Sequence, residues 1–572
     1  MRRRKRAALL AAVAVLAATA GTAAAVGPLY DASDRSADLH EQIDPSAPKN
    51  VILLIGDGTD ENILTAARNY EKGAGGTFEA LDNLPFVGDM TTYGLQVGPN
   101  PNDYPIAYVS DSAPTATAWS TGKKTVDGRV SQGPSSAETI PGEDYETVLE
   151  QYEDDGKLTG NVTTSALTDA TPAAAAAHIN LRGCQGPEDM AQCSAARKAA
   201  GGKGSIAEQL VDNQVDVLLG GGYNRFDQSI DADPTKTVID YAQEERGYRL
   251  LQTAGELDAI TSLDGGPLLG LFAGQSGSEH MTPLYEPLVA TAAGAGGPTT
   301  KCSPADRGNQ PSLAQMTDKA IELLDNPKGF FLQVESAMVD KQEHGKDACG
   351  AIGDVVQLEA SLQVALDYQK ANPDTLVIVT GDHSHSTQIV PGPDNGRLTA
   401  TLQTADGDPM TLAYSTQTSD ASSATHTGSM IRVAASGPQA ANVTGYIDQT
   451  DLYETLLGRT PDKIDPEDPP VPPDPPLVGI AAVGKLAGNQ ARKGIPFSAR
   501  APGADKLGVD LVKKGDVLAS KKKNGPSLDG ALKPGGKLKS GDYKLVATAK
   551  GPGGKAVDTA KVVIQVKRKK KG

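Results

Sequence analysis

The stretch Thr375-Leu-Val-Ile-Val-Thr-Gly-Asp-His-Ser-His385 joins a buried-strand pattern directly to metal-type ligands. Its first part is apolar or β-branched, as in a strand that is buried on both faces. Asp382, His383 and His385 follow at once, although the chain has only seven histidines. Open α/β sheets place their sites at the carboxyl edge of the strands, so the stretch predicts a metal site at such an edge. A surface turn that holds two histidines by chance is the alternative.

Other strand and helix patterns surround this stretch. Helices are expected near 61–70, 112–122 and 355–372, and strands at 50–55, 158–165, 215–219 and 329–335. Strands that alternate with helices predict an α/β fold, with a central, mostly parallel sheet between helical layers. A further helix is expected to begin with Thr171 as its cap and Pro172 at its first position, to run through the alanines to His178, and to end near Arg182 and Gly183. Residues from about 224 to 300 are expected to form a surface insertion.

The formal net charge of −17 conceals two regions of opposite sign. Residues 477–572 contain 22 Lys/Arg and 6 Asp/Glu, a net of +16, and the remainder carries −33. Seven prolines in 465–476 predict a stiff linker, and the apolar runs at 543–547 and 562–566 predict short strands. We therefore expect a main domain over 49–464, a linker over 465–477, and a small Lys-rich, β-sandwich-like domain with a basic tail over 478–572.

The N-terminus has the pattern of an export signal. Residues 2–6 are basic, residues 7–20 are apolar, and three alanines at 23–25 form a small-residue cleavage site. We expect a signal peptide over 1–25, a loosely held arm over 26–48, and an extracellular or cell-envelope location, periplasmic if the host has an outer membrane. A retained anchor is the alternative. No other segment approaches about 18 apolar residues, so no integral membrane segment is expected in the mature chain.

Four cysteines suit an exported protein. Three disulfide pairings are open to Cys184, Cys193, Cys302 and Cys349. A zinc site made of all four thiolates is the alternative, but the spacing contains no C-x-x-C unit.

Metal-type ligands also follow other predicted strands. Asp57 and Glu335 each end a strand, and Asp340 and His344 are spaced to share one face of a helix. His426 lies in a polar loop that could close the site. Carboxylates with imidazoles suit Zn²⁺, whereas an oxygen-only set suits Mg²⁺. Such an oxygen-only set is Asp57, Thr171 and Glu335. Two metal ions about 4 Å apart would clamp the attacking and leaving oxygens of an in-line displacement.

A nucleophile and an anion-binding group can also be identified. Ser112 lies at the predicted start of a helix, where backbone amides attract an anion and a zinc ion would activate the hydroxyl. An ordinary helix cap at Asp111 or Ser112 is the alternative reading. Arg182 could grip two phosphate oxygens with its planar guanidinium. A solvated arginine at a helix end is the alternative.

Across about residues 49–460 the chain resembles bacterial alkaline phosphatases. The motifs that carry the resemblance are Ile55-Gly-Asp-Gly58, Asp111-Ser-Ala113, Thr117-Ala-Trp-Ser-Thr-Gly122, Thr168-Asp-Ala-Thr-Pro172, Val334-Glu335, Val339-Asp-Lys-Gln-Glu-His344, Val379-Thr-Gly-Asp-His-Ser-His385 and His426-Thr-Gly428. The resemblance implies a central sheet flanked by helices, hydrolysis of phosphate monoesters, and usually a homodimer. With sequence proximity, it also predicts the disulfides Cys184–Cys193 and Cys302–Cys349.

The resemblance further implies individual roles. Ser112 would be the nucleophile that forms a phosphoserine, and Arg182 would hold the phosphate. One zinc ion would be held by Asp340, His344 and His426, and a second by Asp57, Asp382 and His383. The magnesium ion would be held by Asp57, Thr171 and Glu335. Asp169 and Lys341 match the enterobacterial pattern, where other members carry histidines. His385 would support Asp340.

Some features fall outside the resemblance. Pro114 follows the nucleophile where a small residue is expected, and 59–61 replaces a glycine-containing stretch. A phosphodiesterase of the same superfamily is the alternative function, and a phosphate-binding surface protein without activity is a third. The basic C-terminal region is expected to bind an anionic cell-surface polymer or extracellular nucleic acid. A solvated lysine-rich domain is the alternative.

Overall fold

The computed structural model describes residues 35–98, 104–231, 233–393, 397–416, 423–459, 478–482, 484–501, 504–536, 538–551 and 556–567. The predicted signal peptide and the predicted linker lie outside these residues. Within the described part of the predicted arm, α1 (Ser36–Glu41) is a short helix. Among the described residues, no helix combines the length and the apolar composition that crossing a membrane requires.

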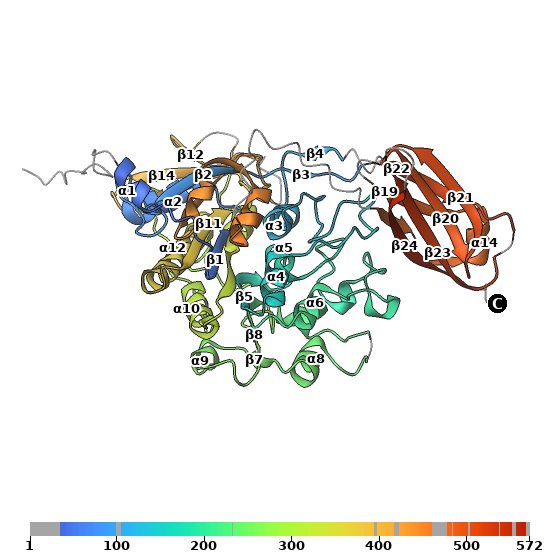
Figure 1. Cartoon of the computed structure of the whole chain (residues 1–572). Helices are drawn as coiled ribbons and strands as arrows, with labels where there is room; N and C mark the ends of the chain where they lie inside the picture. The colour runs from blue at the N-terminus through green and yellow to red at the C-terminus, as the bar shows by residue number, and fades with distance from the viewer. Residues whose placement is uncertain are drawn as a thin grey trace, which may run out of the picture.

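A ten-stranded sheet forms the centre of the main domain (Figure 1). Its strands, in spatial order, are β16 (Gly445–Asp448), β2 (Phe86–Thr91), β15 (Ile431–Ser436), β11 (Thr375–Gly381), β1 (Asn50–Gly56), β10 (Phe330–Ser336), β5 (Leu158–Ala166), β6 (Val217–Gly221), β8 (Leu268–Leu271) and β7 (Arg249–Leu251). Only β15 runs antiparallel to its neighbours in this sheet, and every other pair is parallel. The predicted α/β class with a mostly parallel sheet is confirmed.

Helices cover both faces of this sheet, and each face has its own apolar core. Successive residues of β1 point to opposite faces, so Ile52 and Leu54 join one cluster while Val51, Leu53 and Ile55 join the other. The first cluster includes side chains of α2 (Glu61–Lys72), α10 (Leu313–Leu324) and α12 (Ala348–Ala371). The second includes side chains of α3 (Ser112–Thr121), α4 (Val148–Asp154), α5 (Ala170–Ala176), α6 (Ile206–Asp212) and α8 (Val238–Glu245).

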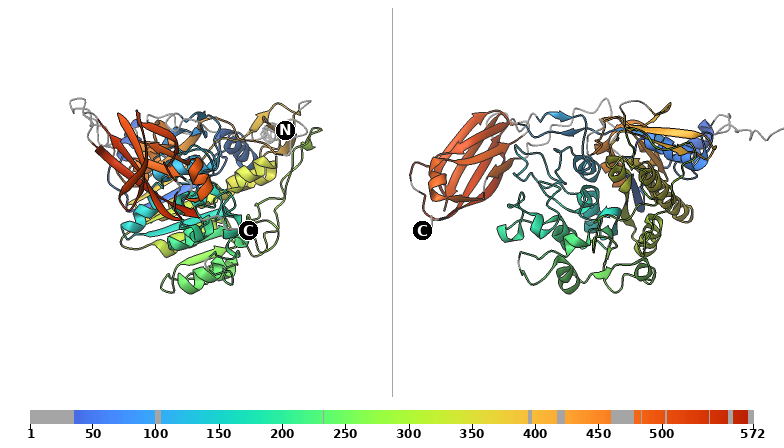
Figure 2. Two further views of the ribbon diagram at one scale, coloured as in Figure 1. Left: turned by 90° about the vertical axis from the view of Figure 1, so that its right-hand side faces the viewer. Right: turned by 180° about the vertical axis from the view of Figure 1, so that it is seen from behind.

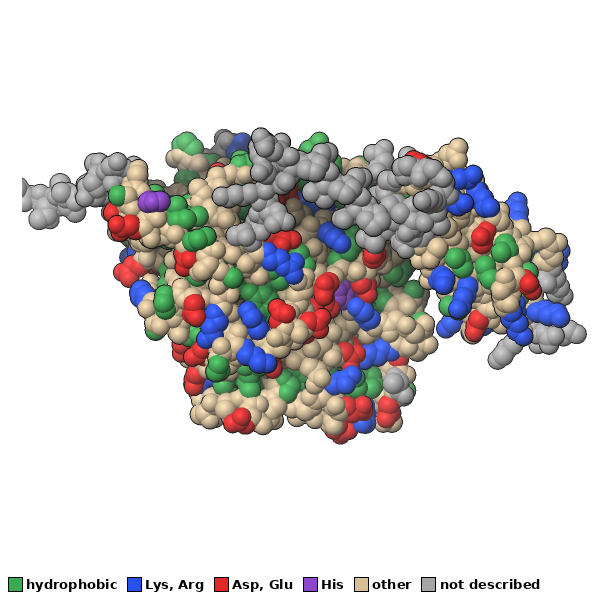
Figure 3. Space-filling model, viewed as in Figure 1, with side chains coloured by type: hydrophobic (Ala, Val, Ile, Leu, Met, Phe, Trp, Pro, Cys, Tyr) green, Lys and Arg blue, Asp and Glu red, His purple; other side chains and the backbone are tan. Residues whose placement is uncertain are grey.

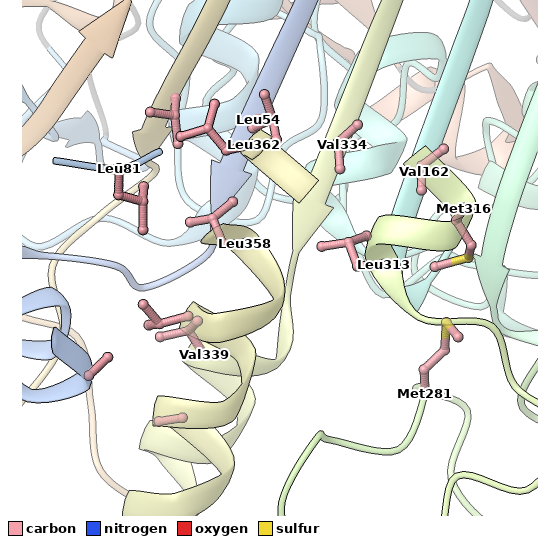
Figure 4. Close-up of a cluster of buried hydrophobic side chains, with 14 of the residues drawn as sticks. Leu54, Leu81, Val162, Met281, Leu313, Met316, Val334, Val339, Leu358 and Leu362 are labelled. Atoms are coloured by element: carbon pink, nitrogen blue, oxygen red, sulfur yellow. The ribbon is translucent and has the colours of Figure 1, made fainter. Parts of the chain in front are cut away.

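Figure 4 shows part of the first cluster. Leu54 and Val334 come from adjoining strands, and Leu358 and Leu362 come from α12, which lies across them. All four side chains are at most 1% exposed. Burying each of them contributes about 1.5–3 kcal/mol, which holds the carboxyl ends of β1 and β10 in fixed positions.

Smaller elements complete the main domain. A four-stranded sheet contains β12 (Thr387–Val390), β14 (Pro409–Tyr414), β13 (Thr399–Gln403) and β9 (Ala295–Gly296). A two-stranded sheet joins β3 (Gly94–Leu95) to β4 (Ile106–Ala107). The short helices are α7 (Tyr223–Phe226), α9 (Ala254–Asp258), α11 (Met338–His344) and α13 (Leu452–Leu456).

The C-terminal region forms two further sheets with a separate apolar core. The three-stranded sheet contains β17 (Gly479–Ala482), β19 (Ile495–Arg500) and β22 (Ser527–Leu532). The five-stranded sheet has the order β18 (Lys485–Ala487), β24 (Ala556–Lys567), β23 (Gly541–Lys550), β20 (Lys506–Lys513) and β21 (Asp516–Asn524), and α14 (Gly488–Lys493) follows β18. Phe497 and Leu528 of one sheet pack in the same cluster as Leu507 and Leu545 of the other. These sheets lie at one side of the molecule in Figures 1 and 2.

The structure corrects two expectations. The region 224–300 is not only a surface insertion, because β7 and β8 extend the main sheet and bury Leu268 and Leu271 completely. The helix around Thr171 is capped by Asp169, whose carboxylate accepts the N–H of Ala170. That helix ends at Ala176, before His178, because the next residue is extended. Local rules rank aspartate at least as high as threonine as a helix cap, whereas the place of β7 and β8 in the main sheet depends on tertiary packing.

Both predicted disulfides are confirmed. Cys184 is bonded to Cys193 and Cys302 to Cys349, which excludes a site of four thiolates. The second bond ties the loop before α10 to the start of α12, across 47 positions of sequence.

Candidate metal centre

The carboxyl ends of β1, β10 and β11 align in the sheet. Gly56 of β1 pairs with Ser336 of β10 and with Gly381 of β11, so the residues that follow these strands meet at one edge. Asp57 N–H donates to the carbonyl of Ser336 at 3.1 Å, and Gly58 N–H donates to Asp382 Oδ1 at 2.8 Å. Parallel register therefore brings together side chains that are more than 300 positions apart.

Asp340, His344, His385 and His426 form the first possible metal group, with their ligand atoms within 4.8 Å of one another. Asp340 and His344 are one turn apart on α11. Asp340 Oδ1 lies 3.2 Å from His426 Nε2, 3.4 Å from His344 Nε2 and 3.6 Å from His385 Nε2. Three imidazole nitrogens thus converge on one buried carboxylate oxygen.

The tautomers of two of these rings test whether a cation fits. His344 Nδ1 faces the carbonyl of Ala424 at 2.5 Å, and His426 Nδ1 faces the carbonyl of Ser110 at 2.9 Å. A ring nitrogen that faces a carbonyl carries the proton, so both Nε2 atoms present lone pairs. These two Nε2 atoms are 3.1 Å apart. Lone pairs at that separation repel unless a proton or a metal ion lies between them, and two imidazole nitrogens beside the carboxylate of Asp340 are ligands that fit a zinc ion.

Asp57, Asp382 and His383 form the second group, which is fully buried. His383 Nε2 lies 3.2 Å from Asp382 Oδ2 and 3.5 Å from Asp57 Oδ1. Burial and the neighbouring carboxylates of Asp382 and Asp340 raise the pKa of Asp57 well above its usual range. Burial also raises the pKa of Asp382 to about 6. A divalent cation would relieve this crowding, so the second group also fits a metal ion.

Asp57, Thr171 and Glu335 supply only oxygen atoms. Thr171 Oγ1 is buried and has no hydrogen-bond partner in the described part of the chain. Glu335 is 1% exposed, and burial raises its pKa to about 7. Its Oε2 accepts hydrogen bonds from the hydroxyls of Thr163 and, at 3.2 Å, Ser165. A buried carboxylate and an unpartnered hydroxyl are the kind of oxygen donors that a hard cation such as Mg²⁺ prefers.

Ser112 lies next to the second group. Asp111 is the N-cap of α3 and accepts the N–H of Ala113 at 2.7 Å, so the capping role falls to Asp111. The hydroxyl of Ser112 therefore remains available. It lies 3.2 Å from His383 Nε2 and 3.3 Å from Asp57 Oδ2. A serine at the first position of a helix also has backbone amides beside it for an anion.

Arg182 is oriented by two carboxylates. Its guanidinium donates to Asp111 at 2.7 Å and to Asp169 at 2.5 Å, and the side chain is still 27% exposed. Lys341 Nζ contacts Asp169 at 2.9 Å and Asp340 at 3.4 Å. Burial alone would raise the pKa of Asp169, but Lys341 and Arg182 outweigh it and hold that pKa well below its usual range. Asp169 therefore stays ionised and holds the side chains of Arg182 and Lys341 in position.

A pocket opens beside the first group. It is lined by Val109, Ser110, Asp111, Asp127, His344, Thr425 and His426. Burial and the nearby Asp111 raise the pKa of Asp127 to about 6. The pocket gives a ligand a route to the metal groups from solvent.

Sequence reasoning missed some residues of this region. Asp127 was not considered, because a lone aspartate outside a motif carries no signal. His385 was expected only to support Asp340, whereas the structure places it among the possible ligands. The hydroxyls of Thr163 and Ser165 were also missed. The sequence signal for them is their spacing, because two hydroxyl residues two positions apart on a strand point to the same face.

Two groups of aspartate and histidine beside a buried serine, at the carboxyl edge of a parallel sheet, define a metal-dependent hydrolase of the α/β class. A family model described as alkaline phosphatase matches residues 48–420. The chain belongs to the alkaline phosphatase family.

Similar proteins agree with this assignment. The alkaline phosphatase of Escherichia coli (strain K12) is 45% identical, over 74% of this chain and 88% of the relative. The streptomycin-6-phosphate phosphatase of Streptomyces griseus is 41% identical, over 73% of this chain and 91% of the relative. The crystal structure of Thermus thermophilus alkaline phosphatase superimposes with a TM-score of 0.53 at 20% identity, over 75% of this chain and 94% of that chain. At that identity, the last comparison supports the fold alone.

Proposed function

We propose that this enzyme is an exported alkaline phosphatase that hydrolyses phosphate monoesters through a phosphoserine at Ser112, with two zinc ions and one magnesium ion. Family membership supports phosphate monoester hydrolysis. The observation that carries the finer proposal is the position of the buried hydroxyl of Ser112 beside Asp57 and His383 of the second group.

Each metal is assigned to residues of this chain. One zinc ion would be held by Asp340, His344 and His426, with His385 close enough to add a fourth ligand. The other would be held by Asp57, Asp382 and His383. The magnesium ion would be held by Asp57, Thr171 and Glu335. When bound, these ions supply Lewis-acid stabilisation of the charge that develops on the attacking and leaving oxygens.

The side chains of the chain account for the remaining steps. Ser112 Oγ attacks phosphorus, so that its O–P bond forms while the ester O–P bond breaks and the alcohol leaves with a proton. Water then attacks the phosphoserine, which releases inorganic phosphate and restores the hydroxyl. Arg182 grips two phosphate oxygens with its fork, and Asp111 and Asp169 hold that fork in place. Lys341, held by Asp169, adds positive charge beside the phosphate.

A monoester suits this site better than a diester. A monoester has more charged oxygens to face Arg182 and Lys341, both of which are firmly held. We expect rapid hydrolysis of p-nitrophenyl phosphate and much slower hydrolysis of its bis ester. Faster turnover of the bis ester would favour the phosphodiesterase alternative.

Trapping the intermediate tests the role of Ser112. Acid quenching during turnover of a ³²P-labelled monoester should leave label on the peptide that contains Ser112. Ser112→Ala should lose the label and at least about a thousandfold in kcat. The matched control is Ser120→Ala, which changes a buried serine on the same helix and should keep both. Label on another residue, or normal turnover of Ser112→Ala, would overturn this role.

Export and dimer formation complete the proposal. Two disulfides and the N-terminal pattern support an oxidising location outside the cytoplasm.

Val87, Met430 and Tyr446 expose apolar side chains on or beside the neighbouring strands β2, β15 and β16. Such a patch supports a homodimer. Sedimentation should give twice the chain mass for the wild type and a smaller fraction of dimer for Val87→Arg.

The basic C-terminal region has a separate role in this proposal. Its net charge of +16 supports attachment to an anionic cell-surface polymer, which would keep the exported enzyme near its source.

A further inference from the structure

The outer face of the five-stranded C-terminal sheet collects lysines from several strands. Tyr543, Leu545, Ala547 and Ala549 of β23 point inward and are buried, so the alternate residues point outward. The register then places exposed lysines of several strands on that same outer face. Five of them are Lys506, Lys522, Lys544, Lys550 and Lys561. We call these five residues the lysine face. Figure 3 shows that Lys and Arg recur over the visible side of this region, with fewer acidic side chains between them.

The lysine face places like charges next to one another. Lys506 of β20 lies directly opposite Lys550 of β23, and Lys522 lies opposite Gly508, the second residue along from Lys506. Among the described residues, no ion pair reaches any member of the lysine face. Directly opposed like charges destabilise a sheet, so this arrangement opposes folding unless an anion compensates it.

Protection of a sheet edge does not explain the lysine face. Lysines commonly blunt edge strands against pairing with other chains, and β21 is such an edge. Lys544 and Lys550, however, lie on β23, which is paired with β20 on one side and β24 on the other. Their charge is presented from the middle of the sheet.

The other residues of the outer face indicate the chemistry of the partner. Gly508, Val546 and Thr548 lie between the lysines, and the face also carries Asp510 and Asp542, which the lysines outnumber. The aromatic side chains of the described C-terminal sheets, Phe497 and Tyr543, are buried in the core. The outer face therefore has no aromatic platform on which a nucleic acid base can stack. Lysine ammonium groups act as point charges without geometric demands, which suits repeated phosphates on a flexible chain.

We infer that the lysine face binds a polyol-phosphate polymer, the chemistry of cell-wall teichoic acids. This inference rests on the attachment proposed above and specifies its surface and its ligand. Repeated phosphodiesters along an extended chain would neutralise the opposed lysines of neighbouring strands. The same contact would hold the catalytic domain close to a surface that is rich in phosphate esters.

The test compares two charge-matched variants of the full-length protein. The face variant replaces lysines that point outward: Lys506→Gln, Lys544→Gln, Lys550→Gln and Lys561→Gln. The control variant replaces exposed lysines of the same region that lie in turns or on the other side of β21: Lys514→Gln, Lys523→Gln, Lys533→Gln and Lys539→Gln. Circular dichroism should give the same spectrum for both, and p-nitrophenyl phosphate turnover should match that of the wild type.

Binding to purified poly(glycerol phosphate) is then measured at several salt concentrations. We expect the face variant to lose about tenfold or more in affinity and to show a shallower salt dependence, because fewer counterions are released. The control variant should stay within about twofold of the wild type. Equal losses of affinity in both variants would show that the lysine face is not the binding surface, although the C-terminal region still binds the polymer. Absence of wild-type binding would overturn attachment itself, and neither outcome affects the catalytic proposal, which turnover reports.

Two comparison ligands complete the experiment. Oligo(dT) carries phosphodiesters with bases, and polyglutamate carries carboxylates without phosphate. Weaker binding of both than of poly(glycerol phosphate) supports the inference. Tighter binding of oligo(dT) would overturn the choice of a base-free polymer. Sedimentation without polymer checks whether the face binds a second, acidic copy of the chain, in which case the face variant would change the oligomeric state and the inference would fail.

Discussion

At the carboxyl edge of the ten-stranded sheet, charged side chains are buried and face one another, whereas on the outer face of the five-stranded sheet they are exposed and unpaired. Asp57, Asp382 and Asp340 are each at most 2% exposed. Lys506 and Lys550 are exposed and oppose each other across two strands. The comparison shows that a buried charge must be stabilised by a partner held at a defined position. An exposed charge is already stabilised by water, so it can bind a partner of variable shape.

Removal of metal should give the largest difference between the two regions, because only the catalytic region is proposed to bind metal ions. Dialysis against a chelator should reduce monoester turnover by about a thousandfold or more, since each ion stabilises charge on a reacting oxygen. It should also lower the unfolding temperature of the catalytic region, because a bound ion contributes about 4 kcal/mol at a thousand times its Kd. Calorimetry and turnover measure these effects. Restoring zinc and magnesium should recover both, and an unchanged catalytic transition would contradict the metal assignment.

Core substitutions should show whether the two regions unfold independently. Leu53→Ala and Leu545→Ala each remove a fully buried leucine, one from the catalytic core and one from the C-terminal core. Each should cost about 2–5 kcal/mol in the free energy of unfolding. We expect Leu545→Ala to destabilise only the C-terminal transition and to leave turnover unchanged. A single transition that both substitutions shift equally would show that the regions unfold together.

Substrate binding should depend on the guanidinium of Arg182, which Asp111 and Asp169 hold in place. Arg182→Ala should raise KM for p-nitrophenyl phosphate about tenfold to a hundredfold, because hydrogen bonds to a charged group are worth about 1.5–3 kcal/mol. Arg182→Lys should recover part of this loss, since lysine keeps the charge but not the planar fork. Steady-state kinetics with inorganic phosphate as inhibitor measures both. An unchanged KM would place Arg182 outside the phosphate site.

A smaller effect concerns a buried pair remote from the metal groups. His178 Nε2 lies 2.7 Å from Glu150 Oε1, and the His178 side chain is 2% exposed. Burial lowers the pKa of His178, but the hydrogen bond to Glu150 outweighs it and the net pKa is raised. Burial raises the pKa of Glu150, but His178 outweighs it and the net pKa is lowered. Both shifts favour the ionised pair.

The sign of each shift sets the pH range of this stabilisation. The contribution of His178 is complete below its unfolded pKa and is lost as pH rises through its folded pKa. The contribution of Glu150 is complete above its unfolded pKa and is lost as pH falls through its folded pKa. His178→Gln should therefore cost about 1–3 kcal/mol near neutral pH and less at alkaline pH. Urea unfolding across pH measures this, and a cost that grows with rising pH would contradict the assignment.

The sequence alone determined the strands, the ligand types and the family resemblance. The run Thr375–Gly381 is apolar enough to be read as a buried strand, and the Asp and His residues that follow it have no common structural use other than a site. The same holds for Asp340 and His344, because helical spacing is a local property. Motifs of this kind carry their chemistry in residues that are adjacent in sequence.

Only the tertiary structure decided which distant residues meet and how their charges balance. The parallel register of β1, β10 and β11 brings Asp57 beside Asp382, and packing of the loop at 423–428 brings His426 onto Asp340. Tertiary packing also placed β7 and β8, which lie within 224–300, in the main sheet. Burial and register depend on neighbours from remote parts of the chain, which local pattern and propensity do not encode.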